Sequence, residues 1–304
     1  MAATLILLAA ACGGGSVTGP SMSSTGNTFA PTGGSPPAPS SVSIAGTIVD
    51  TISGASIGSF SETVGALPAV VTVSHPGYLT RQTTVGSATP SVDLIRNAPP
   101  FSHEFYQRFL RDAGSGRMAA WRPQRQEPRI YLRTINDVGN DVDAVTLALT
   151  ERALTDVALL WTGGRMGFAT FERGTGTHEG EAGWITIKWS SSQDRCGQAV
   201  VGGTWIELEN GNSKCWCRGE QSRVSPLVVK HELGHAFGYY HTDDPSDVMF
   251  ELATGGCDKN PSARERYHAE IAYRRQSGNN DPDVDAATIR PLSTQRDRDV
   301  VIID

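Results

Sequence analysis

The sequence predicts a mixed α and β chain, in which a small all-β unit precedes a larger α/β (α+β) lobe built from a twisted mixed sheet and helices. In the first unit, between about residues 42 and 96, short runs of alternating apolar and polar residues are separated by Gly, Ser and Pro, which is typical of strands joined by turns. After residue 128, strand-like runs alternate with stretches of helical periodicity. That alternation predicts a lobe in which helices pack on a sheet.

The all-β unit is predicted to be a small sandwich over residues 42–96. Its strands are expected at residues 42–48, 69–73 and 92–94. The segment Val73-Ser-His-Pro-Gly-Tyr78-Leu-Thr-Arg81 resembles the Gly-Tyr signature of carboxypeptidase-regulatory-like domains. The resemblance implies a surface-binding or spacer module. Because no cluster of site residues accompanies the signature, a structural spacer is the simpler interpretation.

The larger lobe is expected to begin near residue 128, after a helical connector over residues 97–127. A capped helix from Ser102 to Leu110 is predicted within the connector. The predicted order of elements in the lobe is strand 129–133, helix 141–160, strands 167–171 and 184–189, edge strand 196–201, strand 204–208, and helices 226–237 and 261–276.

One predicted helix carries a histidine pattern that predicts a metal site. In His231-Glu-Leu-Gly-His235-Ala-Phe-Gly238-Tyr-Tyr-His241, the first two histidines are four residues apart. They therefore lie one turn apart on one helix face, within reach of one zinc ion. Gly238 gives the chain the freedom to leave the helix, so that His241 returns as the third ligand. Glu232 is placed as a general base and not as a ligand, and a fourth coordination position stays open.

Ordinary helix histidines are the alternative interpretation, since a lone histidine is more often a packed or surface residue than a ligand. Five fixed positions within one segment favour the metal site. The helix that presents them has its own start signals, with Ser225 as N-cap and Pro226 at the first helical position.

The segment has the HExxHxxGxxH pattern of the metzincin zinc peptidases, and the eight-residue step from His241 to Met249 resembles the matrixin branch. The resemblance covers roughly residues 128–277. It implies a metzincin-like catalytic domain over residues 128–304, one catalytic zinc ion, and hydrolysis of peptide bonds in a protein or peptide substrate. It also implies that Met249 lies in a tight turn beneath the metal. Phe250-Glu-Leu252 stands where the family usually has Tyr-Pro, in the stretch that shapes the specificity pocket.

The resemblance also suggests how a substrate is held. In the family, the antiparallel edge strand over the cleft pairs with an extended peptide. Ala199 and Val200, in the predicted edge strand, are therefore candidate substrate contacts, and Phe250 is a third. If residues 196–201 are instead the end of an interior strand, the first two have no such role.

Composition and charge exclude several classes of function. The chain has 304 residues, 38% apolar residues and a formal net charge of −6. It has no basic run of the kind that binds a phosphate backbone, so no nucleic-acid partner is expected. No apolar stretch is long enough to span a bilayer. The length suits about two folded parts, and we expect a monomer.

The N-terminal residues predict export. The apolar stretch from Thr4 to Ala11 precedes Cys12, which resembles a bacterial lipoprotein signal over residues 1–12 whose cysteine becomes lipidated. Residues 13–41 are rich in Gly, Ser, Thr and Pro and are expected to form a disordered linker. A lipid-anchored protein of the bacterial cell envelope or outer surface is predicted. Secretion after removal of a plain signal peptide is the alternative.

The remaining cysteines, Cys196, Cys215, Cys217 and Cys257, are predicted to form two disulfides. Cys215 and Cys217 are separated by one residue and are not expected to bridge each other, so each should pair with Cys196 or Cys257. Both pairings remain open. A second metal site is the alternative, but Cys-x-Cys lacks the gap of two to four residues that is common in structural zinc sites.

Two further hypotheses concern calcium and binding. The acidic stretch with Asp281, Asp283 and Asp285 has oxygen ligands spaced as in a calcium loop, but it lacks the glycine and terminal glutamate of the twelve-residue loop. A solvated acidic turn is expected there. The alternative function for the chain is a surface-exposed binding lipoprotein with a structural zinc site. Glu232 argues against it, because a structural site needs no acid beside its ligands.

Overall fold

The computed structural model describes residues 41–192, 194–217, 219, 221–252, 257–280, 283–286 and 300–303. Residues 40–304 form one compact unit. The expected signal peptide, the lipidation site Cys12 and nearly all of the expected linker lie outside the described residues.

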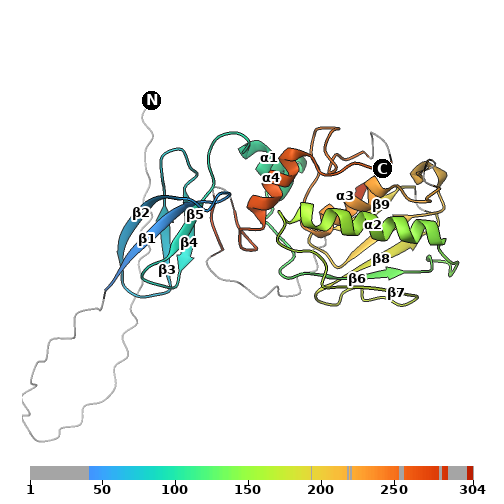
Figure 1. The fold of residues 1–304 in the computed structure, drawn as a ribbon, viewed down its shortest axis with the longest axis horizontal. Helices are drawn as coiled ribbons and strands as arrows, with labels where there is room; N and C mark the ends of the chain where they lie inside the picture. The colour runs from blue at the N-terminus through green and yellow to red at the C-terminus, as the bar shows by residue number, and fades with distance from the viewer. Residues whose placement is uncertain are drawn as a thin grey trace, which may run out of the picture. The chain divides into compact units, whose positions relative to one another are not determined.

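The N-terminal part of the unit holds two small sheets that share one core (Figure 1). The first sheet has the order β2-β1-β5, formed by β1 (Val42–Asp50), β2 (Ser56–Val64) and β5 (Ser91–Leu94). The second sheet is the antiparallel pair β3 (Ala69–Val73) and β4 (Arg81–Val85). Alternate residues of these strands point inward, and the shared core consists of Ile44, Ile48, Val71, Val73, Val85, Val92 and Leu94.

The larger lobe is built on a six-stranded mixed sheet with the order β11-β9-β10-β8-β6-β7. Its strands are β6 (Arg129–Arg133), β7 (Thr170–Gly174), β8 (Trp184–Ser190), β9 (Gly197–Val200), β10 (Trp205–Glu209) and β11 (Val300–Ile303). β6, β7, β8 and β10 run parallel, whereas β9 is antiparallel to β10 and β11 is antiparallel to β9. The molecule therefore has the predicted mixed α and β class.

The described residues also form the α-helices α1 (His103–Arg111), α2 (Ala144–Trp161), α3 (Pro226–Ala236) and α4 (Ala263–Ala272), with short 3-10 turns η1 (Ala113–Ser115) and η2 (Ser213–Cys215). α2 packs against α3, and α3 packs against β9 and β10. The N-caps Ser102, Asp143, Ser225 and Ser262 accept hydrogen bonds from the first turns of the four α-helices.

Two expectations about the sheet were wrong. The segment 196–201 was expected at the edge, but β11 pairs along its outer side, so β9 is an interior strand of the described sheet. The strand expected at residues 167–171 instead spans Thr170–Gly174. The second difference is a shift at an element boundary, where local sequence is least informative.

The connector and the acidic stretch also differ from expectation. α1 does not merely bridge two parts, because Phe105, Phe109 and Leu110 are buried in the core of the lobe. Asp283 and Asp285 were expected in a solvated turn, but both are buried. Each pairs with an arginine, and their carboxylates are thereby engaged within the protein. Asp281, the third acid of the stretch, lies outside the described residues.

Among the residues that the structure describes, no helix combines the length and the apolar character that crossing a membrane requires.

Candidate metal centre

α3 is a fully buried helix whose ends are fixed by neighbouring segments. At its start, the Ser225 side chain accepts from the Leu227 N–H at 3.3 Å and donates to the Cys257 carbonyl at 2.7 Å. Pro226 takes the first helical position, where its missing N–H costs nothing. All eleven residues of the helix are buried. The helix therefore holds its side chains in a rigid environment.

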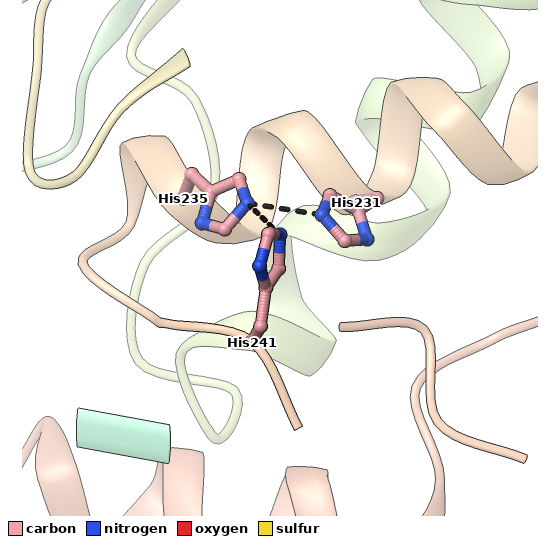
Figure 2. A group of neighbouring side chains, drawn as sticks. All are labelled: His231, His235 and His241. Carbon is pink, nitrogen blue, oxygen red and sulfur yellow. Dashed lines mark hydrogen bonds between the residues drawn. The ribbon is translucent and has the colours of Figure 1, made fainter. Parts of the chain in front are cut away.

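His231 and His235 on α3 converge with His241, which follows the helix (Figure 2). The Nε2 atoms of His231 and His235 are 2.9 Å apart, and those of His235 and His241 are 3.2 Å apart. Tetrahedral coordination with zinc–nitrogen distances of about 2.0 to 2.1 Å separates two ligand nitrogens by about 3.3 Å. The three imidazoles are thus spaced to share one metal ion.

The second nitrogen of each helical histidine fixes which nitrogen carries the proton. His231 Nδ1 lies 2.7 Å from the Val248 carbonyl oxygen, and His235 Nδ1 lies 2.7 Å from the Tyr239 carbonyl oxygen. A carbonyl can only accept, so each Nδ1 donates its proton and each neutral Nε2 presents a lone pair. Two lone pairs at 2.9 Å repel each other, and a cation between them removes the repulsion. Such outer partners are typical of metal-ligating histidines.

The protonation state of the histidines suits a metal. Burial, followed by the nearby His241 ring, lowers the pKa of His231 to about 3. Burial, followed by the neighbouring histidine rings, lowers the pKa of His235 well below its ordinary value. Burial also lowers the pKa of His241. Since a metal binds the neutral imidazole, a site that disfavours imidazolium favours coordination.

Gly238 makes the turn that brings His241 back toward α3. Its φ is +102°, a conformation that residues with a side chain rarely adopt. A Cβ at this position would also lie 2.5 Å from the Arg122 carbonyl oxygen and 2.8 Å from the Trp121 ring. The next residue, Tyr239, stacks on Phe109 with ring centroids 4.3 Å apart. The connector therefore packs directly against the segment that carries His241.

Met249 is fully buried and lies close to α3. A Cβ at Gly234 would stand 2.3 Å from its sulfur, so a glycine in the helix permits this approach. The N–H groups of Val248 and Met249 donate to the Glu265 carboxylate at 3.1 and 2.8 Å. Because the Val248 carbonyl in turn holds His231, Glu265 supports the orientation of this histidine. The resemblance to the family did not indicate this role.

Glu232 is buried with no exposed surface. Among the described residues, neither of its carboxylate oxygens has a hydrogen-bond partner. Burial raises the pKa of Glu232 well above its ordinary value. Gly197 of β9 lies against it, since a Cβ there would be 2.5 Å from Oε1. Buried unpaired carboxylates are rare and mark functional groups more often than structural ones.

Two disulfides fasten the segments around α3. Cys196 bonds to Cys215 and Cys217 bonds to Cys257. The prediction that Cys215 and Cys217 do not bridge each other, and that each pairs with Cys196 or Cys257, is confirmed. The structure also shows which of the two possible pairings forms. Disulfides persist in oxidising compartments, so the two bonds indicate an extracytoplasmic location.

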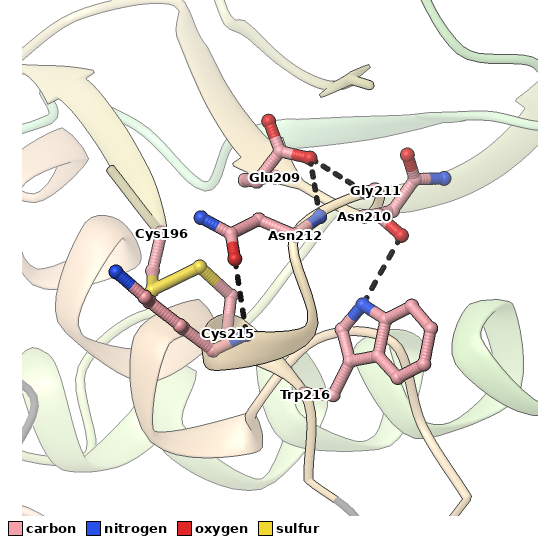
Figure 3. The surroundings of a disulfide bond; sticks show 8 residues. Cys196, Glu209, Asn210, Gly211, Asn212, Cys215 and Trp216 are labelled. Atoms are coloured by element: carbon pink, nitrogen blue, oxygen red, sulfur yellow. Dashed lines mark hydrogen bonds between the residues drawn. A yellow bond between two sulfur atoms is a disulfide. The ribbon is translucent and has the colours of Figure 1, made fainter. Parts of the chain in front are cut away.

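The first disulfide fixes the start of β9 (Figure 3). Cys196 immediately precedes Gly197, the residue in contact with the buried carboxylate. Its partner Cys215 ends η2, whose N-cap Asn212 accepts from the Lys214 N–H at 3.1 Å. Glu209 Oε1 accepts from the N–H of Asn212 at 3.0 Å, which holds this turn to the end of β10. The disulfide thus ties the strand beside Glu232 to a rigid turn.

The candidate substrate contacts have different environments. Ala199 is fully buried, and its side chain belongs to the core. Its backbone is paired with that of Val301. Val200 is half-buried and borders a surface hollow of about 320 Å³ with Gly180, Gly203 and Trp205. Phe250 is half-buried and forms a bridge with Thr242. Cys12 lies outside the described residues.

The chain matches no known protein family in a scan of family descriptions, and no curated protein matches it.

Proposed function

We propose that this protein is a zinc-dependent endopeptidase. The observation that carries the proposal is the combination of three neutral imidazoles, converging through Nε2 atoms 2.9 and 3.2 Å apart, with a buried, unpaired carboxylate on the same helix. Three protein ligands leave a fourth position for water and substrate, and an acid beside them serves as a base. A purely structural site would need neither.

His231, His235 and His241 would hold a zinc ion, which when bound would act as a Lewis acid toward water and the substrate carbonyl. Glu232 accepts a proton from the attacking water and returns it to the amine nitrogen as the peptide bond breaks. Burial raises the pKa of this carboxyl well above its ordinary value, because the site is shielded from water. Val248 and Tyr239 carbonyls keep the two helical imidazoles in the required tautomer.

The proposed substrate is an extracytoplasmic protein or peptide. The two disulfides support export. We further propose that the chain is attached to the bacterial envelope by lipid at Cys12, with residues 13–41 as the tether. We propose that Phe250 and Val200, both half-buried, contribute to the cleavage site preference; Phe250 pairs with Thr242, the residue after His241.

Hydrolysis of casein by the purified protein tests the proposal. Wild type, Glu232→Gln and His241→Ala are compared, each with measured zinc content and with 1,10-phenanthroline followed by zinc. We expect wild type to cleave, chelation to abolish cleavage and zinc to restore it. Glu232→Gln should keep its zinc but lose at least about a hundredfold in turnover, since positioned acid–base groups contribute about 10² to 10⁴. His241→Ala should retain less zinc.

A surface-binding protein with a structural zinc site is the competing function. It predicts that chelation unfolds the protein while Glu232→Gln changes nothing. Near wild-type proteolysis by Glu232→Gln would refute the role of this residue as the base.

A further inference from the structure

The outer edge of β9 is occupied by the end of the same chain. β11 (Val300–Ile303) runs antiparallel to β9, and the register places Val300 opposite Val200 and Ile303 opposite Gly197. The sequence of β11 is Val-Val-Ile-Ile, four β-branched residues in succession, which is the residue class that most favours strands. β11 lies about 100 residues after β9 in the sequence, and it thus covers the outer edge of β9.

One residue of β9 contacts the proposed base. Gly197 is in contact with Glu232, and a Cβ on Gly197 would stand 2.5 Å from Oε1 and 2.8 Å from Cγ. Ile303 is the residue paired with Gly197. An extended peptide that adds to the outer edge of β9 therefore pairs with the residue that contacts the carboxylate, at the place where β11 now ends. Peptide addition to a sheet edge uses the same backbone groups whatever the side chains are.

We infer that β11 is an internal competitor for extended substrate: it holds the outer edge of β9 and must leave before a peptide can pair there. The inference rests on the proposed peptidase function and names how the site is regulated. One strand edge offers one set of backbone donors and acceptors, so β11 and substrate exclude each other. β11 belongs to the same chain, and its effective concentration at the edge is set by the linking segment and not by dilution.

The size of the effect follows from the occupancy of the edge. When only a fraction of molecules has a free edge, the apparent affinity for substrate falls by that fraction. If β11 is paired in about nine molecules of ten, its removal improves kcat/KM about tenfold. The gain should appear mainly in KM, because the ligands and base are the same in both proteins. A strand that only shields a sheet edge from aggregation would give no such gain.

The activity test compares zinc-loaded wild type with a protein that ends at Asp299. We expect kcat/KM for an extended fluorogenic peptide to rise about tenfold on removal of residues 300–304, with kcat changed less than twofold. Val301→Pro and Ile302→Pro in the full-length chain provide matched variants. Neighbouring residues of a strand direct their N–H groups to opposite sides, so one of the two prolines removes a hydrogen bond to β9 and the other does not. We expect the two variants to differ in activity.

A binding test separates this inference from the proposed function. A labelled peptide of residues 296–304 is titrated into Glu232→Gln protein, both full-length and ending at Asp299, and binding is followed by fluorescence polarisation. We expect binding to the shortened protein, at least tenfold weaker binding to the full-length one, and weak binding of a scrambled peptide to both. If the peptide binds in this way but no form of the protein hydrolyses a substrate, the competition between β11 and extended peptides is supported and the proposed peptidase function is refuted. Hydrolysis that is equal with and without residues 300–304, or equal binding to both proteins, would refute the competition and leave the peptidase.

Discussion

At the scale of single residues, three glycines determine how closely the groups of the site approach one another. Gly197 admits the Glu232 carboxylate, Gly234 admits the Met249 sulfur, and Gly238 turns the chain at φ +102°. In each case an added Cβ would stand within 2.5 Å of a neighbouring atom. Contacts of that kind force neighbours to move. The shape of the site therefore depends on having glycine at these three positions as much as on the histidines.

Gly197→Ala tests this at the base. The new methyl group would overlap the carboxylate of Glu232, whose oxygen is 2.5 Å from that position. We expect the glutamate to be displaced and turnover to fall on the order of a hundredfold, as is typical of a misplacement of about 1 Å. Zinc content should be unchanged, because the three atoms nearest to the added methyl group all belong to Glu232 and not to a histidine. Gly167→Ala is the control, since its nearest neighbour, Leu159, is 4.0 Å away. Equal turnover of both variants would contradict the argument.

At the scale of elements, α4 is connected to its surroundings by the side chains of Glu265 and His268. Glu265, the third residue of its capping box with Ser262, reaches the turn at Val248 and Met249. His268 joins α4 to α1. Its Nδ1 donates to the Arg264 carbonyl at 2.7 Å, and its Nε2 lies 3.1 Å from the Ser102 nitrogen and 3.2 Å from the Ser102 carbonyl oxygen. Burial of the ring favours its neutral form.

The pairing of α1 with α4 should weaken in acid. Burial lowers the pKa of His268 to about 4, whereas an unfolded histidine has a pKa of about 6.5. Between these values the unfolded chain binds more protons, so stability is fully present above about pH 6.5 and is lost as pH falls toward 4. From pH 7 to pH 5 this residue alone should remove about 2 kcal/mol. Urea unfolding of wild type and His268→Gln at both pH values isolates that loss, because all other histidines are common to the two proteins. An identical pH dependence would refute it.

Local signals predicted α3 well. Ser225, Pro226 and the histidine spacing are all contained within the helix and its next turn, so the sequence suffices to place the three imidazoles on converging sides. The capping box of α4 is likewise readable as Ser262-x-x-Glu265. The hydrogen bonds from Val248 and Met249 to Glu265 could not be predicted, because they depend on which loop packs against the start of α4.

Non-local pairing explains the larger error. β9 was expected at the sheet edge from the resemblance to the family, with an interior strand as the alternative. The alternative holds, because β11 reaches β9 from residues 300–303. The burial of Asp283 and Asp285 was missed for a similar reason. Acidic residues in a turn-rich stretch are usually solvated. The fold brings Arg81 from the distant strand β4 to Asp285, whereas Arg275, eight residues before Asp283, pairs with that residue.

At the scale of the whole molecule, a buried ion network joins the small sheets to the lobe. Arg275, which follows α4, pairs with Asp283 and reaches Asp93 of β5, and its side chain has no exposed surface. Arg81 of β4 pairs with Asp93 and Asp285. Against burial, which raises it, the two guanidinium groups lower the pKa of Asp93 to about 2. The N-terminal sheets are therefore integrated with the lobe and do not act as a loose spacer.

Arg275→Met tests whether the network holds the molecule together. Methionine has similar length but no charge, so Asp283 and Asp93 lose a buried partner. Breaking a buried ion pair on one side costs about 3 to 5 kcal/mol, because the remaining charge stays desolvated. Arg152→Met is the control: Arg152 is exposed and pairs with Asp156 on the surface of α2, where such a pair contributes about 0.3 to 0.5 kcal/mol.

Urea unfolding of both variants, followed by tryptophan fluorescence and by circular dichroism, gives their free energies of unfolding. We expect coincident transitions in wild type and the control, and an earlier transition in Arg275→Met. A loss no larger than that of the control would mean that the sheets and the lobe are held by apolar packing alone.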